Sequence, residues 1–330
     1  MSRLLARKAP GTFKTLPLYV EATAEGLNYH ALGLPLNFAQ MLERRRPVQA
    51  ADCQRFALEL ANLGVSVRLT LAWQGRDYWV LVRQRRPDRG DTVLKLISGY
   101  VPAHELNLPL LTAIAEVAEE CLIECAGGWL GGRYADTWLP TPYPLRYRED
   151  CHFRLGPLSG AARPVQCGNL MLMERPRAYV HLPTASLQLV YDLRLELPRE
   201  CREPSLFHVD ERLEDGELVA RLERRRPDLY LLPLHDGRPG SELFSLRRGE
   251  LLPASTRGLW LSEGFAEQDG WLVRDERIRW RDWQANCAAR STHRVAARAD
   301  PAEPHLLRIF STMAVVELFS TRPSTRTSPP

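Results

Sequence analysis

The segment TVLKLISGYVPAHELNLPLLTAIAEVAEECLIE, residues 92–124, contains the most informative pattern in the chain. Apolar residues dominate 92–97, which predicts a short strand, and a loop is expected from Ser98 to Leu108. Pro109 suits the first turn of a helix, which we expect to continue to about Glu124. Residues 92–125 are therefore predicted to form a strand–loop–helix unit. One side of this helix can face a core through Ile114, Val117, Ala118 and Cys121.

Three glutamates on the predicted helix are spaced for a shared face. Glu116, Glu119 and Glu120 lie at positions i, i+3 and i+4, which project from the same side of a helix. Like charges at this spacing repel each other, and a divalent cation would relieve the repulsion. Mg²⁺ takes oxygen ligands, commonly one or two carboxylates together with waters and substrate phosphates. The spacing predicts a site for a divalent cation such as Mg²⁺, although the pattern taken alone also fits a solvated acidic face.

A β-hairpin is predicted immediately before this unit. Residues 65–73 alternate apolar and polar side chains, Gln74-Gly75 marks a turn, and a second strand is expected over 78–86. Arginines near the end of that strand could grip substrate phosphates through bidentate contacts, or could pair with carboxylates instead. These predicted substrate-binding residues are Arg83, Arg85 and Arg86.

Residues 65–124 resemble the Nudix hydrolase family, whose signature is G-x5-E-x7-R-E-U-x-E-E-x-G-U, with U bulky and apolar. Gly99 and Glu105 stand in the G-x5-E relation, and residues 115–123 match most of the second half. The resemblance implies an α/β fold, a Nudix-like mixed β-sheet flanked by helices. It also implies that Glu116, Glu119 and Glu120 bind Mg²⁺ or Mn²⁺, and that Glu116 orients or deprotonates a water molecule. Glu105 would assist catalysis from the loop, and Gly99 would contribute to substrate binding.

The segment also departs from that signature. The spacing between Glu105 and Glu116 is two residues longer, Ala115 replaces the arginine, and Leu122 replaces the glycine. Two hypotheses follow. The first is a Mg²⁺-dependent hydrolase of a nucleoside diphosphate derivative, which would bind a phosphorylated small molecule. The second is a catalytically inactive Nudix-like module that binds a nucleotide or a protein partner.

The remaining sequence divides into regions of different character. We expect an N-terminal extension over 1–50, the Nudix-like domain over 51–200, a β-rich C-terminal region over 201–285 and a disordered tail over 286–330. A helix is predicted over 52–63 with Asp52 as its N-cap, and a second helical piece over Asn37–Arg45. Short strands are predicted near 170, and at 187–197, 218–223, 229–234 and 270–274.

Composition narrows the class of protein. Hydrophobic residues make up 45% of the 330 residues, so a real core is expected. The net charge of +4 is too small to indicate nucleic-acid binding by itself, and an RNA-binding accessory protein is a third hypothesis. The seven cysteines are odd in number and include no C-x-x-C pair, which favours reduced, buried thiols and a cytoplasmic protein. No apolar run is long enough to predict a membrane span.

Two further observations concern particular residues. The whole chain resembles bacterial proteins often labelled "metal ABC transporter ATPase", but none of the three lysines follows a glycine, so no P-loop supports that label. Four tryptophans fall near the predicted site, where one could stack on a base. Packing in the core is the expected role for each of them, namely Trp73, Trp79, Trp129 and Trp138.

Overall fold

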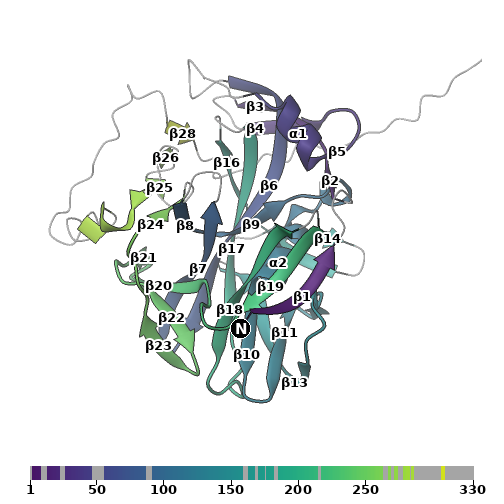
Figure 1. The fold of residues 1–330 in the computed structure, drawn as a ribbon. Coiled ribbons are helices and arrows are strands. Elements are labelled where there is room, and N and C mark those ends of the chain that lie inside the picture. Colours follow the sequence, from purple (N-terminus) through teal and green to yellow (C-terminus); the bar gives the residue numbers. More distant parts are fainter. Residues whose placement is uncertain are drawn as a thin grey trace, which may run out of the picture.

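The computed structural model describes most of the chain up to residue 262 and short pieces beyond it. The described residues are 2–8, 13–22, 27–46, 56–86, 91–158, 163–167, 170–174, 176–181, 185–214, 217–262, 267–268, 271–273, 278–282, 284–285 and 306–308. Strands predominate among them (Figure 1).

The elements in the first half of the chain include both α-helices. In order, they are β1 Ser2–Lys8, β2 Lys14–Thr15, β3 Leu18–Ala22, β4 Leu27–Ala31, β5 Leu36–Asn37, α1 Phe38–Arg44, β6 Phe56–Trp73, β7 Arg76–Arg86, β8 Asp91–Lys95, β9 Ile97–Tyr100, the 3-10 turn η1 Ala103–Glu105, α2 Pro109–Glu120, β10 Cys121–Cys125, β11 Gly128–Tyr134, β12 Thr137–Trp138 and β13 Tyr147–Pro157.

The elements of the second half are strands. They are β14 Arg163–Cys167, β15 Leu170–Glu174, β16 Arg177–His181, β17 Ser186–Glu196, β18 Ser205–Glu214, β19 Glu217–Glu223, β20 Leu229–His235, β21 Arg238–Pro239, β22 Phe244–Arg247, β23 Glu250–Pro253, β24 Leu259–Leu261, β25 Glu267–Gln268, β26 Trp271–Val273, β27 Ile278–Arg279 and β28 Leu306–Arg308.

Two long parallel strands, β6 and β17, form the centre of the main sheet (Figure 1). They are in register from Asn62–Ala72 against Ser186–Glu196. Alternate side chains of both strands, from Val65 to Leu71 and from Leu187 to Leu195, are buried on the core face. This period of two places every second side chain on the same face, which is why an alternating apolar sequence forms a strand with one buried side.

The sheet extends from this centre in two directions. On one side β17 pairs with β13, which is followed by β11, β10, β18, β19 and β1. On the other side β6 pairs with β7, which is followed by β20, β22 and β23. The N-terminal strand β1 and the late strands β18–β20 therefore belong to the same sheet as the central hairpin.

Helix α2 packs within this arrangement of strands. Its apolar residues Leu110, Ala113, Ile114 and Val117 are buried in the main core. The helix contacts β6 and β9 and also β10 and β18 (Figure 1). Because strands surround α2 on more than one side, even its polar positions lie close to other elements.

The predicted fold class is wrong. The chain is a mostly β protein built on one large mixed sheet, and it is not an α/β Nudix-like sheet flanked by helices. The longest helix among the described residues, α2, is enclosed by strands instead of covering a sheet face from outside. Local spacing predicted the order of strand, loop and helix, but Ser98–Tyr100 belong to strand β9 and not to the expected loop. It carried no information on the many strands that pair around this unit.

Two predicted elements are corrected. Residues 56–63 were expected in a helix but form the first part of β6, while 52–55 lie outside the described residues. Pairing of this segment with β3 and β17 outweighs its helical spacing. Helix α2 ends at Glu120, earlier than predicted, because Cys121–Glu124 pair with Ser205–His208 of β18.

Several predicted elements are confirmed. The hairpin of β6 and β7 turns at Gln74 and Gly75, whose φ angles of 50° and 74° suit a tight turn between twisted strands. Helix α1 begins at the predicted place, with a capping box between Asn37 and Gln40. The strands predicted in the second half correspond to β15, β17, β19, β20 and β26. No helix in the described part of the chain is long and apolar enough to cross a membrane.

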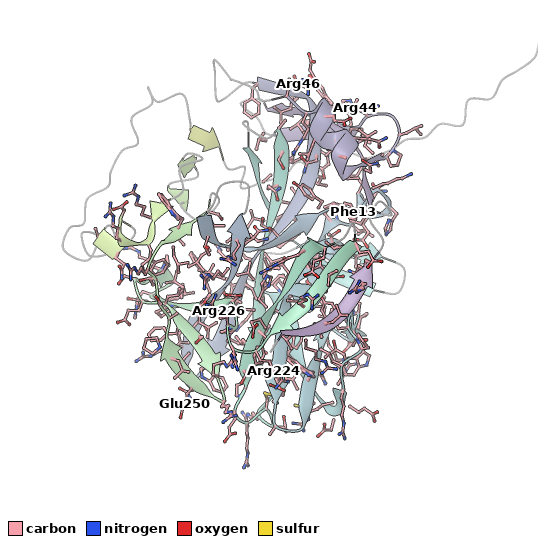
Figure 2. All side chains as sticks on the ribbon, in the orientation of Figure 1. Phe13, Arg44, Arg46, Arg224, Arg226 and Glu250 are labelled. Carbon is pink, nitrogen blue, oxygen red and sulfur yellow. A yellow bond between two sulfur atoms is a disulfide. The ribbon has the colours of Figure 1, made fainter. Side chains whose placement is uncertain are left out.

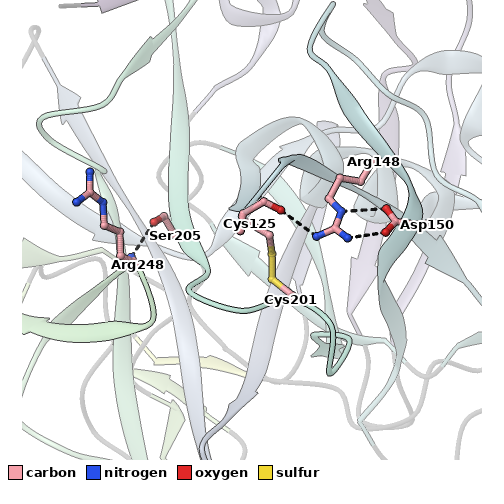
Figure 3. The surroundings of a disulfide bond; sticks show 7 residues. Cys125, Arg148, Asp150, Cys201, Ser205 and Arg248 are labelled. Carbon is pink, nitrogen blue, oxygen red and sulfur yellow. Dashed lines mark hydrogen bonds and ion pairs between the residues drawn. A yellow bond between two sulfur atoms is a disulfide. The ribbon is translucent and has the colours of Figure 1, made fainter.

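A disulfide joins Cys125, at the end of β10, to Cys201, just before β18 (Figure 3). The expectation of reduced thiols is therefore wrong for these two residues, whereas Cys121 and Cys151 are free and buried as expected. Next to the disulfide, Arg148 donates to the Ala126 carbonyl at 3.0 Å and to both carboxylate oxygens of Asp150 (Figure 3). The pair was hidden from the sequence because its members are 76 residues apart.

Candidate functional site

The last turn of α2 carries the three predicted glutamates and places them against other elements. Glu116 lies over β9, and any Cβ at Gly99 would collide with the Glu116 carboxylate. Gly99 is therefore needed for close approach of the helix to β9, while the prediction that it binds substrate remains untested. Gly99 therefore approaches Glu116 of the helix, within a sheet that is not the expected one.

Two lysines and a fourth glutamate complete this region. Lys95 Nζ lies 3.8 Å from Glu120 Oε1 and donates to Ser98 Oγ at 3.0 Å. Lys8 Nζ lies 3.8 Å from both Glu119 Oε2 and Glu211 Oε1. We refer to Glu116, Glu119, Glu120 and Glu211 as the carboxylate cluster. Lys8 comes from β1 and Glu211 from β18, so strands distant in sequence contribute to one site.

The electrostatics of the cluster are unfavourable to full ionisation. Burial, together with the neighbouring Glu120 and Glu119 carboxylates, raises the pKa of Glu116 to about 8. Burial also raises the pKa of Glu119, although Lys8 opposes this shift. The negative end of the α2 dipole lies at the same turn, where basic residues would normally be preferred. Glu116 is therefore protonated at neutral pH in the absence of a compensating cation.

Contacts from other segments fix the end of the helix. The Tyr143 hydroxyl donates to the Glu119 carbonyl at 3.3 Å, and His208 Nδ1 lies 3.3 Å from the Glu120 carbonyl. Burial and the nearby Glu211 and Glu119 carboxylates raise the pKa of Tyr143, so its hydroxyl stays protonated and able to donate. These contacts satisfy carbonyl groups that a helix end leaves without intrahelical partners.

Glu105 lies at the other end of the helix. Its Oε2 accepts a hydrogen bond from Thr112 Oγ1 at 2.5 Å, and His104 Nε2 lies 3.7 Å from its Oε1. Thr112 precedes Glu116 by four residues, which is about one turn of α2. The contact that the structure shows for Glu105 is therefore a tether to the first half of α2, and its role in catalysis stays a prediction.

The cluster can be tested for its fit to a divalent cation. Within the described ranges, no group of three or more His, Cys, Asp or Glu side chains is arranged to hold a metal ion, and the metal-binding roles of Glu116, Glu119 and Glu120 stay predictions. Glu119 faces Lys8. Glu120 Oε2, however, is buried and has no hydrogen-bond partner among the described residues. Because Mg²⁺ commonly uses only one or two carboxylates with waters and phosphates, the Glu116–Glu120 pair fits this cation.

The contacts described for the predicted substrate arginine Arg83 are not with the carboxylate cluster, and the substrate-binding roles of Arg83, Arg85 and Arg86 stay predictions. Arg83 NH1 lies 3.6 Å from Asp228 Oδ1, and Arg83 also contacts Tyr230, both near the start of β20. Arg85 is exposed on β7, and the side chain of Arg86 lies outside the described residues. A second run of arginines occupies residues 224–226. Arg224 pairs with Glu124 and, like Arg226, lies in the lower half of the molecule (Figure 2).

The cationic residues at the cluster are lysines, which sequence reasoning missed. The chain has 44 lysines and arginines but only three lysines, and two of these, Lys8 and Lys95, lie beside the α2 glutamates. Their rarity was a usable signal, because a compact ammonium group suits a point-charge contact with phosphate or carboxylate. For Glu211 and Tyr143 the sequence contains no comparable signal.

No known family model matches the chain, and no curated protein is significantly similar to it.

Proposed function

We propose that the protein is a Mg²⁺-dependent hydrolase of a nucleoside diphosphate derivative, with the end of α2 as its active site. The observation that carries the proposal is the buried Glu116 carboxyl, held against Gly99 beside Glu120 and Lys95. A carboxyl group in such surroundings lowers the stability of the fold when it is ionised. Proteins frequently retain such a group because it has a function. The nucleotide class of substrate is implied by the sequence motif, and the site chemistry supports a phosphorylated ligand.

The residues have distinct roles in this proposal. Glu116 and Glu120 would hold Mg²⁺, which when bound polarises a phosphate and neutralises charge that develops on it. Glu116, which the cation would keep ionised, would also orient the attacking water or accept its proton. Lys95 and Lys8 bind phosphate oxygens as point charges, replacing the arginines that the sequence suggested. Tyr143 and Thr112 hold the two ends of the site in place through the contacts described above.

Cation binding should be linked to proton release. A cation stabilises the ionised form of Glu116 and must displace its proton below pH 8. Affinity for Mg²⁺ should therefore rise with pH and level off above about pH 8. Isothermal titration in two buffers of different ionisation enthalpy measures this proton release directly, and a Glu116→Gln variant should release none.

The activity test uses the full chain with Mg²⁺ or Mn²⁺ and a panel of nucleoside diphosphate derivatives. Release of phosphate or a nucleoside monophosphate is followed, and we expect Glu116→Gln and Glu120→Gln each to lower kcat by about 100-fold or more. Glu250→Gln, an exposed glutamate on β23, is the matched control. Turnover that persists unchanged in both active-site variants would contradict the proposal.

The alternative is a non-catalytic module that binds a nucleotide or protein partner. Ala115 and the location of Arg83 favour it, because the arginine of the signature is absent and the contacts described for Arg83 are not with the cluster. Nucleotide binding that depends on Mg²⁺ and on Glu120, without turnover across the panel, would support this alternative. The absence of both binding and turnover would contradict both functions.

We propose the cytoplasm as the compartment, since nucleoside diphosphate derivatives are made there. The Cys125–Cys201 disulfide is the observation that stands against this location, because structural disulfides are typical of oxidising compartments. Thiol alkylation in intact cells separates the two cases. Cysteines that react only after reduction would place the protein in an oxidising compartment.

A further inference from the structure

A second site is suggested by one face of β11, β12 and β13, on a part of the sheet distinct from α2. Cross-strand register places Arg133 opposite both Trp138 and Arg154, and Gly131 opposite His152. Residues opposite each other, and residues two apart on one strand, project from the same face. Trp138, Arg133, His152 and Arg154 therefore share one face, and we refer to them as the Trp–Arg cluster.

Trp138 is the largest exposed aromatic group of the described residues. Its side chain is 52% exposed, in contrast to the buried Trp129 and to the expectation that it packs in the core. The ring rests on β11, since its Cζ3 atom would lie 3.5 Å from a Cβ built at Gly131. The Arg133 guanidinium carbon lies 4.9 Å from the ring centroid, and His152 contacts it edge-on at 5.0 Å. These contacts hold the ring in place and leave much of its surface free for stacking.

The arginines of the cluster have no carboxylate counterion among the residues that the structure describes. The one partner of the Arg133 side chain, besides the ring, is the Asp136 carbonyl at 3.1 Å, and its Nε is buried without a hydrogen-bond partner. Arg154 is opposite Glu196, but Glu196 lies 3.4 Å from Arg194 instead. Like charges directly opposite each other on a sheet are destabilising. An anionic ligand between Arg133 and Arg154 would remove this cost.

On the neighbouring part of the same face, by contrast, the arginines are paired with carboxylates. On β6 and β17, Arg68 makes two hydrogen bonds to Asp192, at 2.6 and 3.0 Å, and Arg194 makes two to Asp77, both at 3.2 Å. Each of these arginines therefore has a bidentate carboxylate partner, whereas Arg133 and Arg154 have none within the described part of the chain. The positive charge that remains is concentrated beside the exposed tryptophan.

We infer that the Trp–Arg cluster binds single-stranded nucleic acid. An unpaired base presents a flat π surface that stacks on an aromatic ring, and the adjoining phosphate pairs with a guanidinium. An acidic peptide would satisfy the arginines but would not use the ring, and a neutral sugar would use the ring but not the arginines. His152 adds a neutral hydrogen-bonding group, since burial and the two arginines lower its pKa. A single-stranded nucleic acid satisfies both features at once.

The experiment measures fluorescence anisotropy of labelled oligouridylate and oligothymidylate of about 12 nucleotides, within the usual site size of such surfaces. We expect Trp138→Ala to weaken binding about 10-fold or more, and Trp138→Phe to restore much of the loss. Arg133→Gln and Arg154→Gln should each weaken binding and lower the slope of log K against log salt by about 0.7. Arg257→Gln, an exposed arginine between β23 and β24, is the control.

The competitors identify the chemistry that is recognised. Duplex of the same length should compete poorly because its bases are already stacked, and uridine monophosphate should compete only weakly because it makes one phosphate contact. Polyglutamate that displaces the oligonucleotide equally from wild type and Trp138→Ala would overturn the inference in favour of an acidic polypeptide. Failure of the wild type to bind either single strand at low salt would also overturn it. Neither result affects the hydrolase proposal, because no residue of the carboxylate cluster is involved.

Discussion

The end of α2 and the Trp–Arg cluster both place like charges next to each other, but at different depths. At α2, burial combines with repulsion, and the protein compensates with Lys8, Lys95 and a protonated Glu116. On β11–β13, Arg133 and Arg154 are opposite each other on an outer face, where water screens the repulsion. The comparison shows that buried charges change their protonation state or find partners, whereas exposed charges can stay ionised and available to a ligand.

The largest effect should come from ionising Glu116. Its pKa is raised in the folded protein, so the folded state binds more protons than the unfolded state between about pH 4.5 and 8. Stability should therefore fall through this range and level off above it, and Glu116→Gln should remove the fall. At pH 9 the variant should be more stable than wild type by on the order of 4 kcal/mol. Urea denaturation at several pH values measures the free energy of unfolding of both proteins. The same dependence of stability on pH in wild type and variant would contradict the prediction.

A smaller loss is expected from Gly99→Ala, which tests the close approach of β9 and α2. The added methyl group collides with the Glu116 carboxylate, so the carboxylate must move. We expect a loss of about 2 kcal/mol in the free energy of unfolding and a reduced affinity for Mg²⁺. Gly156→Ala on β13 is the matched control, since a Cβ there would meet nothing within 4 Å. Indistinguishable stabilities of the two variants would show that α2 does not depend on this glycine.

Removing Lys95 should have a more modest effect. Lys95 and Glu120 are only 15% and 19% exposed, so Lys95→Met leaves a largely buried carboxylate without its cation. We expect a loss of about 1 kcal/mol at pH 7, which added Mg²⁺ should partly restore if Glu120 binds the cation. Thermal denaturation with and without Mg²⁺ measures the loss of stability and the part of it that the cation restores. A loss that Mg²⁺ does not change would argue against Glu120 as a ligand.

The smallest effect is expected on the outer face, and its sign is opposite. Arg154→Gln relieves repulsion from Arg133 and should raise the free energy of unfolding by roughly 0.5 kcal/mol at low salt, an increase that high salt removes. Arg68→Gln is the contrasting variant, because it breaks two hydrogen bonds to Asp192 and should lower stability. A destabilising Arg154→Gln would mean that the Trp–Arg cluster supports the fold and is not held ready for a ligand.

The candidate site was predictable only in part. The helix spacing identified Glu116, Glu119 and Glu120 as neighbours on one face, but the close approach of Glu116 to Gly99 depends on how α2 packs against β9. Arg83 and Arg85 were reasonable candidates for phosphate contacts, but register and pairing place Arg83 beside Asp228. Lys8 and Glu211 come from β1 and β18, and no spacing in the sequence relates either of them to α2.

The sequence by itself determined the local units, which are the hairpin of β6 and β7, the capped helix α1 and the start of α2 at Pro109. Periodicity, turn residues and caps act within a few residues, so they can be recognised without the rest of the chain. Tertiary structure decided where β6 begins, where α2 ends and which cations meet the glutamates. Those outcomes depend on strand pairing between distant segments, whose energy is gained only when the whole sheet assembles.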